Sequence, residues 1–230
     1  MLGVFDSGRG GRNALATLRA LAPTADIAFL ADTKNAPYGT KSTEALCRLV
    51  AHDIRRLREV GATHILVACC TASCIYAHLP RALRVGVYPI LRPTVAAAVR
   101  ESRTRRYAIL ATEATVRAGY FARLLTERQR DAHTVSLSAP RLVTLAEEER
   151  TSLSDRAVRE VLTPLCEAIA AADADTVILG CTHFSPFAAP IGELLPSVRC
   201  VASAEEGARA FARALPPACL LGSGRTLDIS

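Results

Sequence analysis

The sequence has almost no lysine, no long apolar run and no leader-like start. Lys34 and Lys41 are the only lysines among 28 basic residues, so arginine supplies the other 26. No apolar run approaches the roughly 20 residues that a membrane-spanning helix needs, and the stretch Val85–Val99 is interrupted by an arginine and two prolines. Met1–Phe5 leads into Asp6 without a basic start or a long apolar core, so we expect a cytoplasmic protein without a signal peptide.

The composition is that of a globular protein. Of the 230 residues, 50% are hydrophobic and 22% charged, which excludes a disordered or fibrous chain. Thirteen Gly and twelve Pro are too few for a low-complexity linker. The length allows one domain of ordinary size or two small ones. Because we expect the protein to be cytoplasmic, we also expect most of its eight cysteines to stay reduced, as core residues or as reactive thiols.

The net charge of +6 raises the question of nucleic-acid binding. The arginines are scattered, and the densest run, Arg100–Arg106, holds four of them just before an expected strand. No aromatic residues interleave with this run, and no helix-turn-helix or zinc-finger spacing is present. A solvated connection is therefore favoured over a nucleic-acid patch.

Short apolar runs alternate with longer amphipathic stretches along the whole chain. The alternation predicts βαβ units and parallel sheets, with ligands bound at the carboxyl ends of the strands. The expected strands are Leu2–Phe5, Ile27–Leu30, His64–Ala68, Val85–Tyr88, Tyr107–Ala111, Val135–Leu137 and Thr176–Leu179. The expected helices are Arg12–Ala22, Ser42–Val60, Thr71–Leu79, Thr94–Arg100, Thr115–Thr126, Ser154–Ala172 and Ala204–Leu215.

The two halves of the chain show a weak internal sequence similarity, referred to below as the echo. The apolar run ILVA (65–68) is followed by Cys69-Cys70-Thr71, and the run VILG (177–180) is followed by Cys181-Thr182-His183. In each half an earlier apolar run also ends in a polar residue, Asp6 in the first and Thr112 in the second. Buried strands resemble one another by chance, but here the polar residues after them match as well. The echo predicts two similar halves, each presenting one thiol to a shared cleft.

A thiol at a strand end that faces a helix N-terminus is favoured as a thiolate. If Cys69 and Cys181 face each other, one can remove a proton from a carbon while the other returns a proton to the opposite face. That chemistry inverts a stereocentre without a cofactor. The alternative for each cysteine is a small core residue. His183 is placed to tune the thiol of Cys181 or to be a structural histidine.

Two loops after strands could line a ligand site. The run Asp6–Gly11 is glycine-rich, so its backbone N–H groups can approach an anion such as a carboxylate. It is neither a P-loop nor a dinucleotide fingerprint, which would need glycine at Asn13. In the second loop, Tyr38 and Gly39 precede a helix that Ser42 can cap. A tight turn and an ordinary connecting loop are the structural alternatives.

A zinc site is not favoured by the spacing of its possible ligands, so we expect no metal. The usual paired Cys-x2-Cys arrangement is absent. The residues that would have to converge are Cys69, Cys70, Cys74, Cys181 and His183.

Several segments together resemble the glutamate racemase family, within the cofactor-independent aspartate/glutamate racemases. The matching strings occur in the family's order and span nearly the whole chain. They are GVFDSGRGG (3–11), ADTKNAPYGTKS (31–42), ACCTAS (68–73), LVTLAEE (142–148), LGCTHF (179–184) and VASAEEGA (201–208).

The resemblance implies an α/β fold of two similar parallel-sheet domains with the active site in the cleft between them. The first domain would comprise residues 1–91 and 203–230, and the second residues 92–202. The resemblance further implies interconversion of L- and D-glutamate without a cofactor. This reaction would supply D-glutamate for peptidoglycan synthesis, and so for cell wall biogenesis and cell shape. The enzyme would be a cytoplasmic isomerase and a homodimer.

The same resemblance assigns roles to individual residues. Cys69 and Cys181 match the two proton-transferring cysteines, and Asp6, Glu147 and His183 match residues that assist them. The positions that match substrate contacts are Asp6, Ser7, Tyr38, Gly39, Cys70, Thr71, Thr182 and His183.

Four positions depart from the family's usual pattern. Cys70 stands where Asn is usual, and Arg92 where Glu is usual; Ala202 replaces Asp and Glu149 replaces Gly. A thiol is a weaker hydrogen-bonding group than an amide, so Cys70 affects affinity or specificity. Two alternatives stay open: a racemase of this family for another amino acid such as aspartate, and a binding protein with weakened or lost catalysis.

Overall fold

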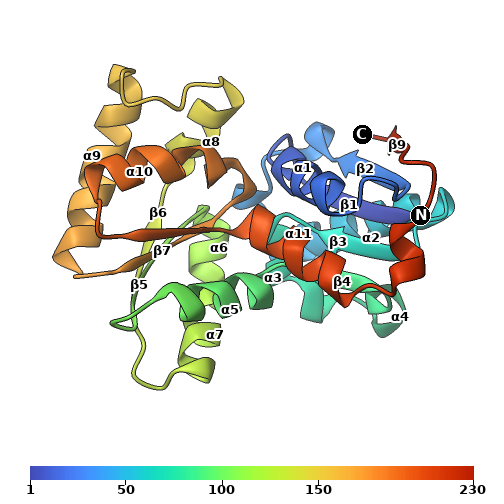
Figure 1. Ribbon diagram of the computed structural model, residues 1–230, viewed down its shortest axis with the longest axis horizontal. Helices are drawn as coiled ribbons and strands as arrows, with labels where there is room; N and C mark the ends of the chain where they lie inside the picture. Colours follow the sequence, from blue (N-terminus) through green and yellow to red (C-terminus); the bar gives the residue numbers. More distant parts are fainter. The chain divides into compact units, whose positions relative to one another are not determined.

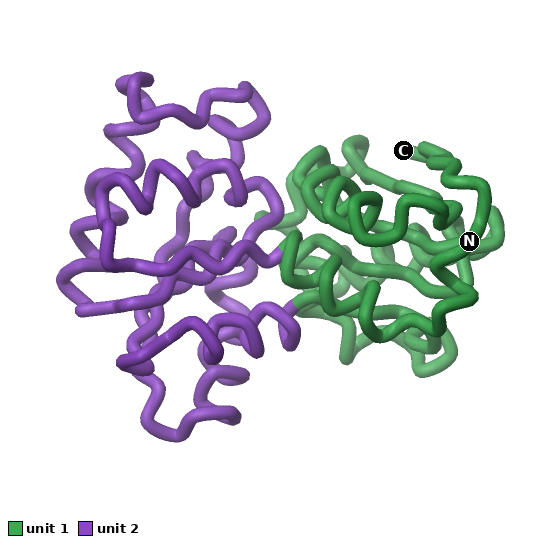
Figure 2. Tube along the Cα trace, viewed as in Figure 1, with its two compact units in different colours: residues 1–90, 204–230 green, residues 91–203 purple.

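The structure, a computed structural model, describes all 230 residues, which divide into two compact units (Figure 2). Unit 1 comprises Met1–Ile90 and Ala204–Ser230, and unit 2 comprises Leu91–Ser203. Unit 2 is therefore a continuous insertion into the chain of unit 1.

Each unit is built on one parallel sheet (Figure 1). The sheet of unit 1 has the order β4-β3-β1-β2-β9, and that of unit 2 has the order β6-β5-β7-β8. Without the edge strand β9, the two orders are the same when β5–β8 are matched in turn to β1–β4. The predicted α/β class with two similar parallel sheets is confirmed. The strands are β1 (Leu2–Asp6), β2 (Ile27–Ala31), β3 (His64–Val67), β4 (Val87–Pro89), β5 (Arg106–Ala111), β6 (His133–Ser138), β7 (Thr176–Gly180), β8 (Arg199–Ala202) and β9 (Thr226–Asp228).

Helices cover both faces of each sheet, and every residue of β1, β2 and β7 is buried accordingly. Unit 1 has α1 (Gly11–Leu21), α2 (Thr43–Glu59), α3 (Cys70–Cys74), α4 (Arg81–Arg84) and α11, whose bounds Ser203–Ala214 begin at the last residue of unit 2. Unit 2 has α5 (Leu91–Glu101), α6 (Glu113–Ala118), α7 (Tyr120–Arg128), α8 (Pro140–Glu147), α9 (Arg156–Ala171) and α10 (Ala188–Leu194). The 3₁₀ turns are η1 (Thr33–Asn35), η2 (Tyr38–Thr40), η3 (Tyr76–His78), η4 (Thr182–Phe187) and η5 (Pro217–Leu220).

The long helix α9 shows how the sequence forms these layers. The Asp155 side chain caps the helix by accepting a hydrogen bond from the N–H of Ala157 (2.8 Å). Val158, Leu162 and Ile169 recur at helical spacing and are fully buried against the sheet core. Burying such a side chain contributes roughly 1.5–3 kcal/mol. In Figure 1, α8, α9 and α10 lie on one side of the strands of unit 2, and α5 and α7 on the other.

The structure differs from the sequence expectation at several elements. The helix expected over 115–126 breaks at Gly119, whose φ of +65° is the left-handed conformation that glycine adopts without cost. The helix expected over 71–79 ends at Cys74 and continues as a 3₁₀ turn. The strands β8 and β9 and the helices α4, α8 and α10 were not expected. No helix is long and apolar enough to cross a membrane.

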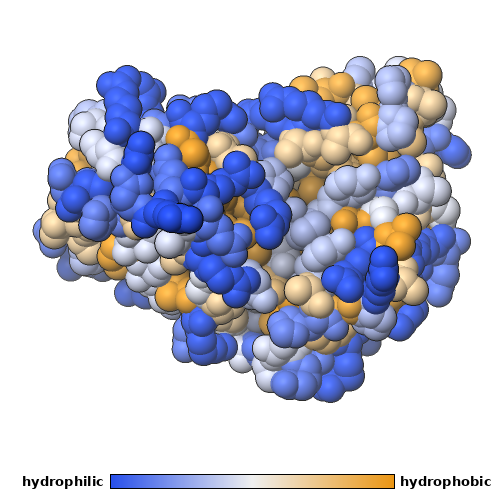
Figure 3. All heavy atoms as spheres, turned by 90° about the horizontal axis from the view of Figure 1, so that it is seen from below, coloured by the Kyte–Doolittle hydropathy of each residue, from blue (hydrophilic) through white to orange (hydrophobic).

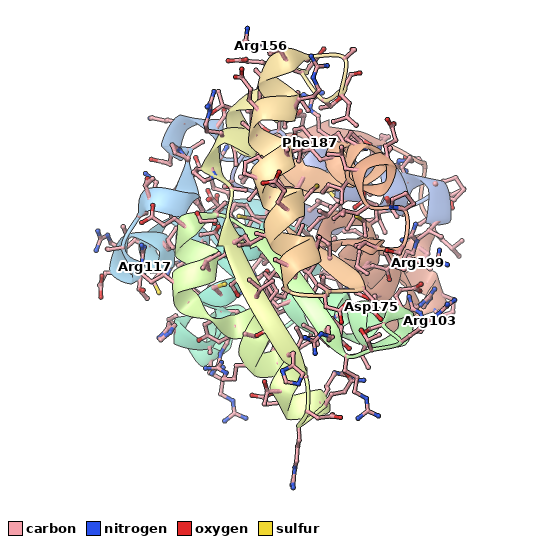
Figure 4. The ribbon with its side chains drawn as sticks, turned by 90° about the vertical axis from the view of Figure 1, so that its left-hand side faces the viewer. Arg103, Arg117, Arg156, Asp175, Phe187 and Arg199 are labelled. Carbon is pink, nitrogen blue, oxygen red and sulfur yellow. The ribbon has the colours of Figure 1, made fainter.

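The arginine-rich run before β5 forms a tight turn held by Asp175. The Asp175 carboxylate accepts hydrogen bonds from the backbone N–H groups of Arg103 (2.6 Å) and Thr104 (2.7 Å). In Figure 4, Arg103 and Arg199 lie near Asp175, well away from Arg156. Figure 3 shows hydrophilic residues over much of the face that it draws, with apolar residues in separate patches between them. The tight turn formed by the arginine-rich run before β5 is consistent with the expected solvated connection.

Candidate active site

The polar residues that follow β1 and β3 lie side by side in unit 1. The two strands are paired in parallel, with Phe5 opposite Val67, so their carboxyl ends meet at one edge of the sheet. The hydroxyl of Ser7 is 3.3 Å from the sulfur of Cys69. Asp6 is fully buried, and one of its carboxylate oxygens accepts a hydrogen bond from the N–H of Gly8 (2.8 Å). The structure thus brings three of the expected site residues together.

Cys69 lies two residues after the end of β3 and caps the next helix, α3. Its sulfur accepts a hydrogen bond from the N–H of Ala72 (3.4 Å) at the start of α3. Burial, and then the nearby carboxylate of Asp6, raise the pKa of the Cys69 thiol to about 11, against the lowering effect of the hydrogen bonds from Ser7 and Ala72. These surroundings favour the thiol form of Cys69 at neutral pH, and not the thiolate expected from its position before a helix.

The absence of a side chain at Gly11 allows Asp6 to occupy its position. A Cβ atom at Gly11 would lie 2.4 Å from the Cβ of Asp6 and 3.3 Å from the ring of Phe29. The first turn of α1 therefore approaches the end of β1 more closely than any other residue would permit. The glycine-rich run thus serves at least one packing purpose beside any contact with an anion.

The loop after β2 is anchored by a buried phenol. The hydroxyl of Tyr38 donates a hydrogen bond to the carboxylate of Asp32 (2.6 Å) and lies 3.1 Å from a carboxylate oxygen of Asp53 on α2. The pKa of Tyr38 is raised by its burial and by the hydrogen bond to Asp32. Gly39 is half-buried beside it, and their 3₁₀ turn η2 packs against α3. Sequence reasoning missed Asp53 because it lies mid-helix, with no motif around it.

In unit 2, the residues that directly follow β7 include a cysteine and a histidine, and a glutamate from another element extends this series. The sulfur of Cys181 lies 3.7 Å from Nδ1 of His183, and Nε2 of the same ring lies 2.5 Å from a carboxylate oxygen of Glu147. Cys181 and His183 are buried, whereas 38% of the Glu147 side chain is exposed. The series has the geometry of a thiol whose proton a carboxylate-oriented imidazole can accept or return.

The fold explains how Glu147 reaches the histidine. Helix α8 packs against η4, the turn that begins at Thr182 and carries His183. Glu147 is the last residue of α8, so its side chain meets the ring across that contact. Thr182 is buried between the cysteine and the histidine.

The remaining positions at which the family resemblance leads us to expect substrate contacts lie at the start of α3. Cys70 and Thr71 are buried residues of its first turn, directly after Cys69. Across the chain, the His, Cys, Asp and Glu side chains form no group of three or more that could hold a metal ion.

Three other departures from the pattern lie outside these clusters of contacts. Arg92 is an exposed residue of α5, and its guanidinium is 3.9 Å from the carboxylate of Glu127. Glu149 has a φ of +58°, the left-handed conformation that favours glycine. Ala202 is the last residue of β8.

Comparison with known proteins gives a consistent result. The sequence model described as Asp/Glu/hydantoin racemase matches residues 12–211. The chain is 40% identical over 189 residues to a glutamate racemase of Desulforudis audaxviator, covering 81% of this chain and about two thirds (67%) of that relative. It is 34% identical over 221 residues to a glutamate racemase of Gloeobacter violaceus, covering 94% of this chain and 81% of the relative. The solved glutamate racemase of Thermus thermophilus, in complex with β-chloro-D-alanine, is 32% identical with a TM-score of 0.79, covering 99% of this chain and 86% of that one.

Proposed function

The chain belongs to the Asp/Glu/hydantoin racemase family, and we propose that it is a cofactor-independent glutamate racemase that uses two cysteine thiols. The observation that carries the proposal is the repeat of one chemical element in two equivalent places. A buried strand ends in Cys-Cys-Thr at Cys69 in unit 1, and the matching strand ends in Cys-Thr at Cys181 in unit 2. The relatives named glutamate racemase support the choice of substrate.

In the proposed reaction, each of the two sulfurs faces one side of the α-carbon of the bound glutamate. One thiolate takes the α-proton, the electron pair stays on the carbon and its carboxylate, and the other thiol delivers its proton to the opposite face. The first sulfur ends as the thiol and the second as the thiolate, so the reverse reaction runs with the roles exchanged. No net oxidation occurs, which is why no redox cofactor is needed.

The surroundings of the sulfurs suggest which one starts as the donor. Burial and Asp6 keep the proton on Cys69 because they raise its pKa to about 11. Cys181 has His183 within 3.7 Å of its sulfur, and Glu147 orients that ring. For the enantiomer whose α-proton faces Cys181, Cys69 therefore acts as the proton donor and Cys181, assisted by His183, as the base; for the other enantiomer the roles are exchanged.

The polar residues around the thiols would hold the substrate. Ser7, Thr71 and Thr182 can hydrogen-bond the α-carboxylate, and Asp6 can pair with the ammonium group. The string PYGTKS, which contains Tyr38 and Gly39 and matches the glutamate racemase family, supports glutamate over aspartate as the substrate. Exclusion of water around the bound substrate would strengthen these interactions as negative charge develops at the α-carbon.

The family resemblance extends the proposal to the cell. D-glutamate made by this reaction would supply peptidoglycan synthesis and so support cell wall biogenesis and cell shape. The enzyme would act in the cytoplasm as a homodimer.

The test is incubation of the purified protein with L- or D-glutamate in heavy water. Circular dichroism follows racemisation, and mass spectrometry follows deuterium at the α-carbon. We expect both signals for the wild type and neither for Cys69→Ser or Cys181→Ser. Cys166→Ser is the matched control, because Cys166 lies on the core face of α9, and it should stay active. Full activity in either site variant would reject the assignment of the two thiols.

Two alternatives are a racemase for another amino acid, such as aspartate, and a binding protein with weakened or lost catalysis. Both are suggested by buried Cys70, which stands beside Cys69 as a weak hydrogen-bonding group where the family usually has an amide. A panel of acidic amino acids separates the cases. Faster racemisation of aspartate than of glutamate would indicate a different substrate. Binding of glutamate without any deuterium uptake would indicate a binding protein.

A further inference from the structure

The buried group Asp32–Tyr38–Asp53 has no part in the proton transfers proposed above. Its members come from three elements of unit 1: Asp32 follows β2, Tyr38 lies in η2 and Asp53 lies on α2. All three are nearly inaccessible to solvent, with exposed fractions of 6%, 2% and 2%. Two carboxyl groups and a phenol thus share one interior position, which is costly unless every proton is well placed.

The number of protons fixes the direction of the hydrogen bonds. The phenol of Tyr38 has one proton, and the shorter contact, 2.6 Å to Asp32 against 3.1 Å to Asp53, identifies Asp32 as its acceptor. The Asn35 side-chain amide also donates to Asp32 (2.9 Å), as expected for a carboxylate. The contact with Asp53 is then satisfied when protonated Asp53 donates to the phenol oxygen. Burial, followed by the repulsion of Asp32, raises the pKa of Asp53 to about 6 against the lowering effect of its contact with Tyr38, so Asp53 carries this proton below about pH 6.

The chain of hydrogen bonds ends at the candidate site. The backbone N–H of Asp32 donates to the carbonyl of Asp6 (2.9 Å), so the loop is joined to the end of β1. Tyr38 belongs to the same core cluster as Cys69. A displacement of the phenol would therefore move the turn that carries Tyr38 and Gly39 relative to the thiol.

We propose that Asp53 is a positioning residue: by donating a hydrogen bond to Tyr38 it holds the Tyr38–Gly39 turn in the conformation that binds the substrate. This inference rests on the proposed racemase function. Protonated Asp53 fixes the turn, and ionised Asp53 repels Asp32 and releases it. The effect falls on substrate affinity rather than on the proton transfers.

The charged and titratable groups around Asp53 come from several elements. Asp32 and Tyr38 face it from the loop after β2, and Cys69 influences Tyr38 from the end of β3. His52 and Arg56 act on it from α2, and the guanidinium of Arg56 is hydrogen-bonded to the carbonyl of Ile229 in the C-terminal segment. The contact with Tyr38 and the two basic groups lower the pKa of Asp53, but they do not outweigh its burial and the repulsion of Asp32.

The experiment compares KM and kcat for Asp53→Asn and Asp53→Ala with those of the wild type, from pH 5.5 to 8. An asparagine amide can donate to Tyr38 at every pH, whereas alanine cannot. At pH 5.5, where the wild-type Asp53 is largely protonated, we expect Asp53→Ala to raise KM about tenfold with kcat changed less than about threefold, as for a loss of substrate positioning. Asp53→Asn should keep a low KM, and the ratio of wild-type to Asp53→Asn KM should rise several-fold with pH.

Two further measurements test whether Asp53 affects KM through Tyr38. In a Tyr38→Phe background the Asp53→Asn change should alter KM less than twofold at any pH, because the link between them is gone. Asp131→Asn is the matched surface control, since Asp131 is an exposed residue paired with Arg105, and its KM should follow the wild type.

A KM ratio that stays flat with pH, or the same ratio in the Tyr38→Phe background, would overturn the inference. The ratio of the wild-type KM to the Asp53→Asn KM tests the inference even if Asp53→Ala fails to fold, since asparagine fits the space of aspartate. A wild type without racemase activity would instead reject the proposed function, so the two failures are distinguishable.

Discussion

The contact between Glu147 and His183 gives the sharpest prediction for the second half of the site. Replacing Glu147 by Gln keeps the size of the side chain but removes its charge. A hydrogen bond that involves a charged group contributes about 1.5–3 kcal/mol, and about 1.4 kcal/mol corresponds to a factor of ten in rate. Because 38% of the Glu147 side chain is exposed, water replaces part of the interaction. We therefore expect kcat/KM to fall at the lower end of this range, about 10- to 30-fold.

The assay can be made to report on one thiol. Two enantiomers have equal free energies in water, so kcat/KM must fall equally in the two directions for any variant, which provides an internal check. The kcat values and the isotope effects, by contrast, can differ between the two directions. Since Glu147 acts through His183 on Cys181, we expect α-deuterated substrate to show a larger isotope effect in the direction in which Cys181 removes the proton. Circular dichroism with each enantiomer measures both quantities.

The neighbouring glutamate supplies the matched control. Glu148 is exposed and pairs with Arg150 at 3.1 Å, so Glu148→Gln should leave kcat/KM within about twofold, as for a surface ion pair. The reasoning is refuted if folded Glu147→Gln also stays within twofold of the wild type, or if the two variants lose activity to the same extent.

Three further predictions concern unit 1. Gly11→Ala places a methyl group 2.4 Å from the Cβ of Asp6, so kcat/KM should fall roughly tenfold or more; Gly192→Ala, with open space around it, should leave it unchanged. Cys70→Asn restores a strong hydrogen-bonding group, so calorimetry should show tighter glutamate binding, and unchanged affinity would exclude a substrate contact there. The pKa of Asp53 is raised from 3.8 to about 6, so its stabilising effect is complete below pH 3.8 and lost as pH rises through about 6. Urea unfolding should accordingly find Asp53→Asn more stable relative to the wild type at pH 8 than at pH 4.5 by about 2 kcal/mol, and a difference that does not change with pH would contradict this.

The strands that precede the two thiols, β3 and β7, could be predicted because each contains a continuous apolar run. Runs such as ILVA and VILG can be buried only in a sheet that is covered on both faces, and β3 and β7 have this position. The strand β8 (Arg199–Ala202) has an exposed arginine and a single buried residue, Val201, so it lacks the continuous apolar run that marks β3 and β7. The strand β9 is exposed throughout and depends on distant contacts, among them the hydrogen bond from the Arg19 guanidinium to the hydroxyl of Thr226 (2.7 Å).

The site residues divide in the same way. Cys69 and Cys181 could be proposed from the residues themselves, since each follows an apolar run directly. Glu147 could not, because it is one of three consecutive glutamates and only the packing of α8 on η4 selects it. Its role was expected solely from the family resemblance. Asp53 had no signal at all, since a single carboxylate within an amphipathic helix is normally exposed.

The insertion of unit 2 into unit 1 has a consequence for dissecting the protein. The chain leaves unit 1 at Ile90 and re-enters it at Ala204, and Gly207 lies so close to Ile90 that a methyl group would come within 2.2 Å of its side chain. The exit and entry points are therefore neighbours, and a short glycine-serine bridge can join them. A gene for residues 91–203 alone would encode a whole sheet with Cys181, His183 and Glu147, and the bridged remainder would encode the other thiol. Mixing the two polypeptides would then test whether tethering is required for turnover.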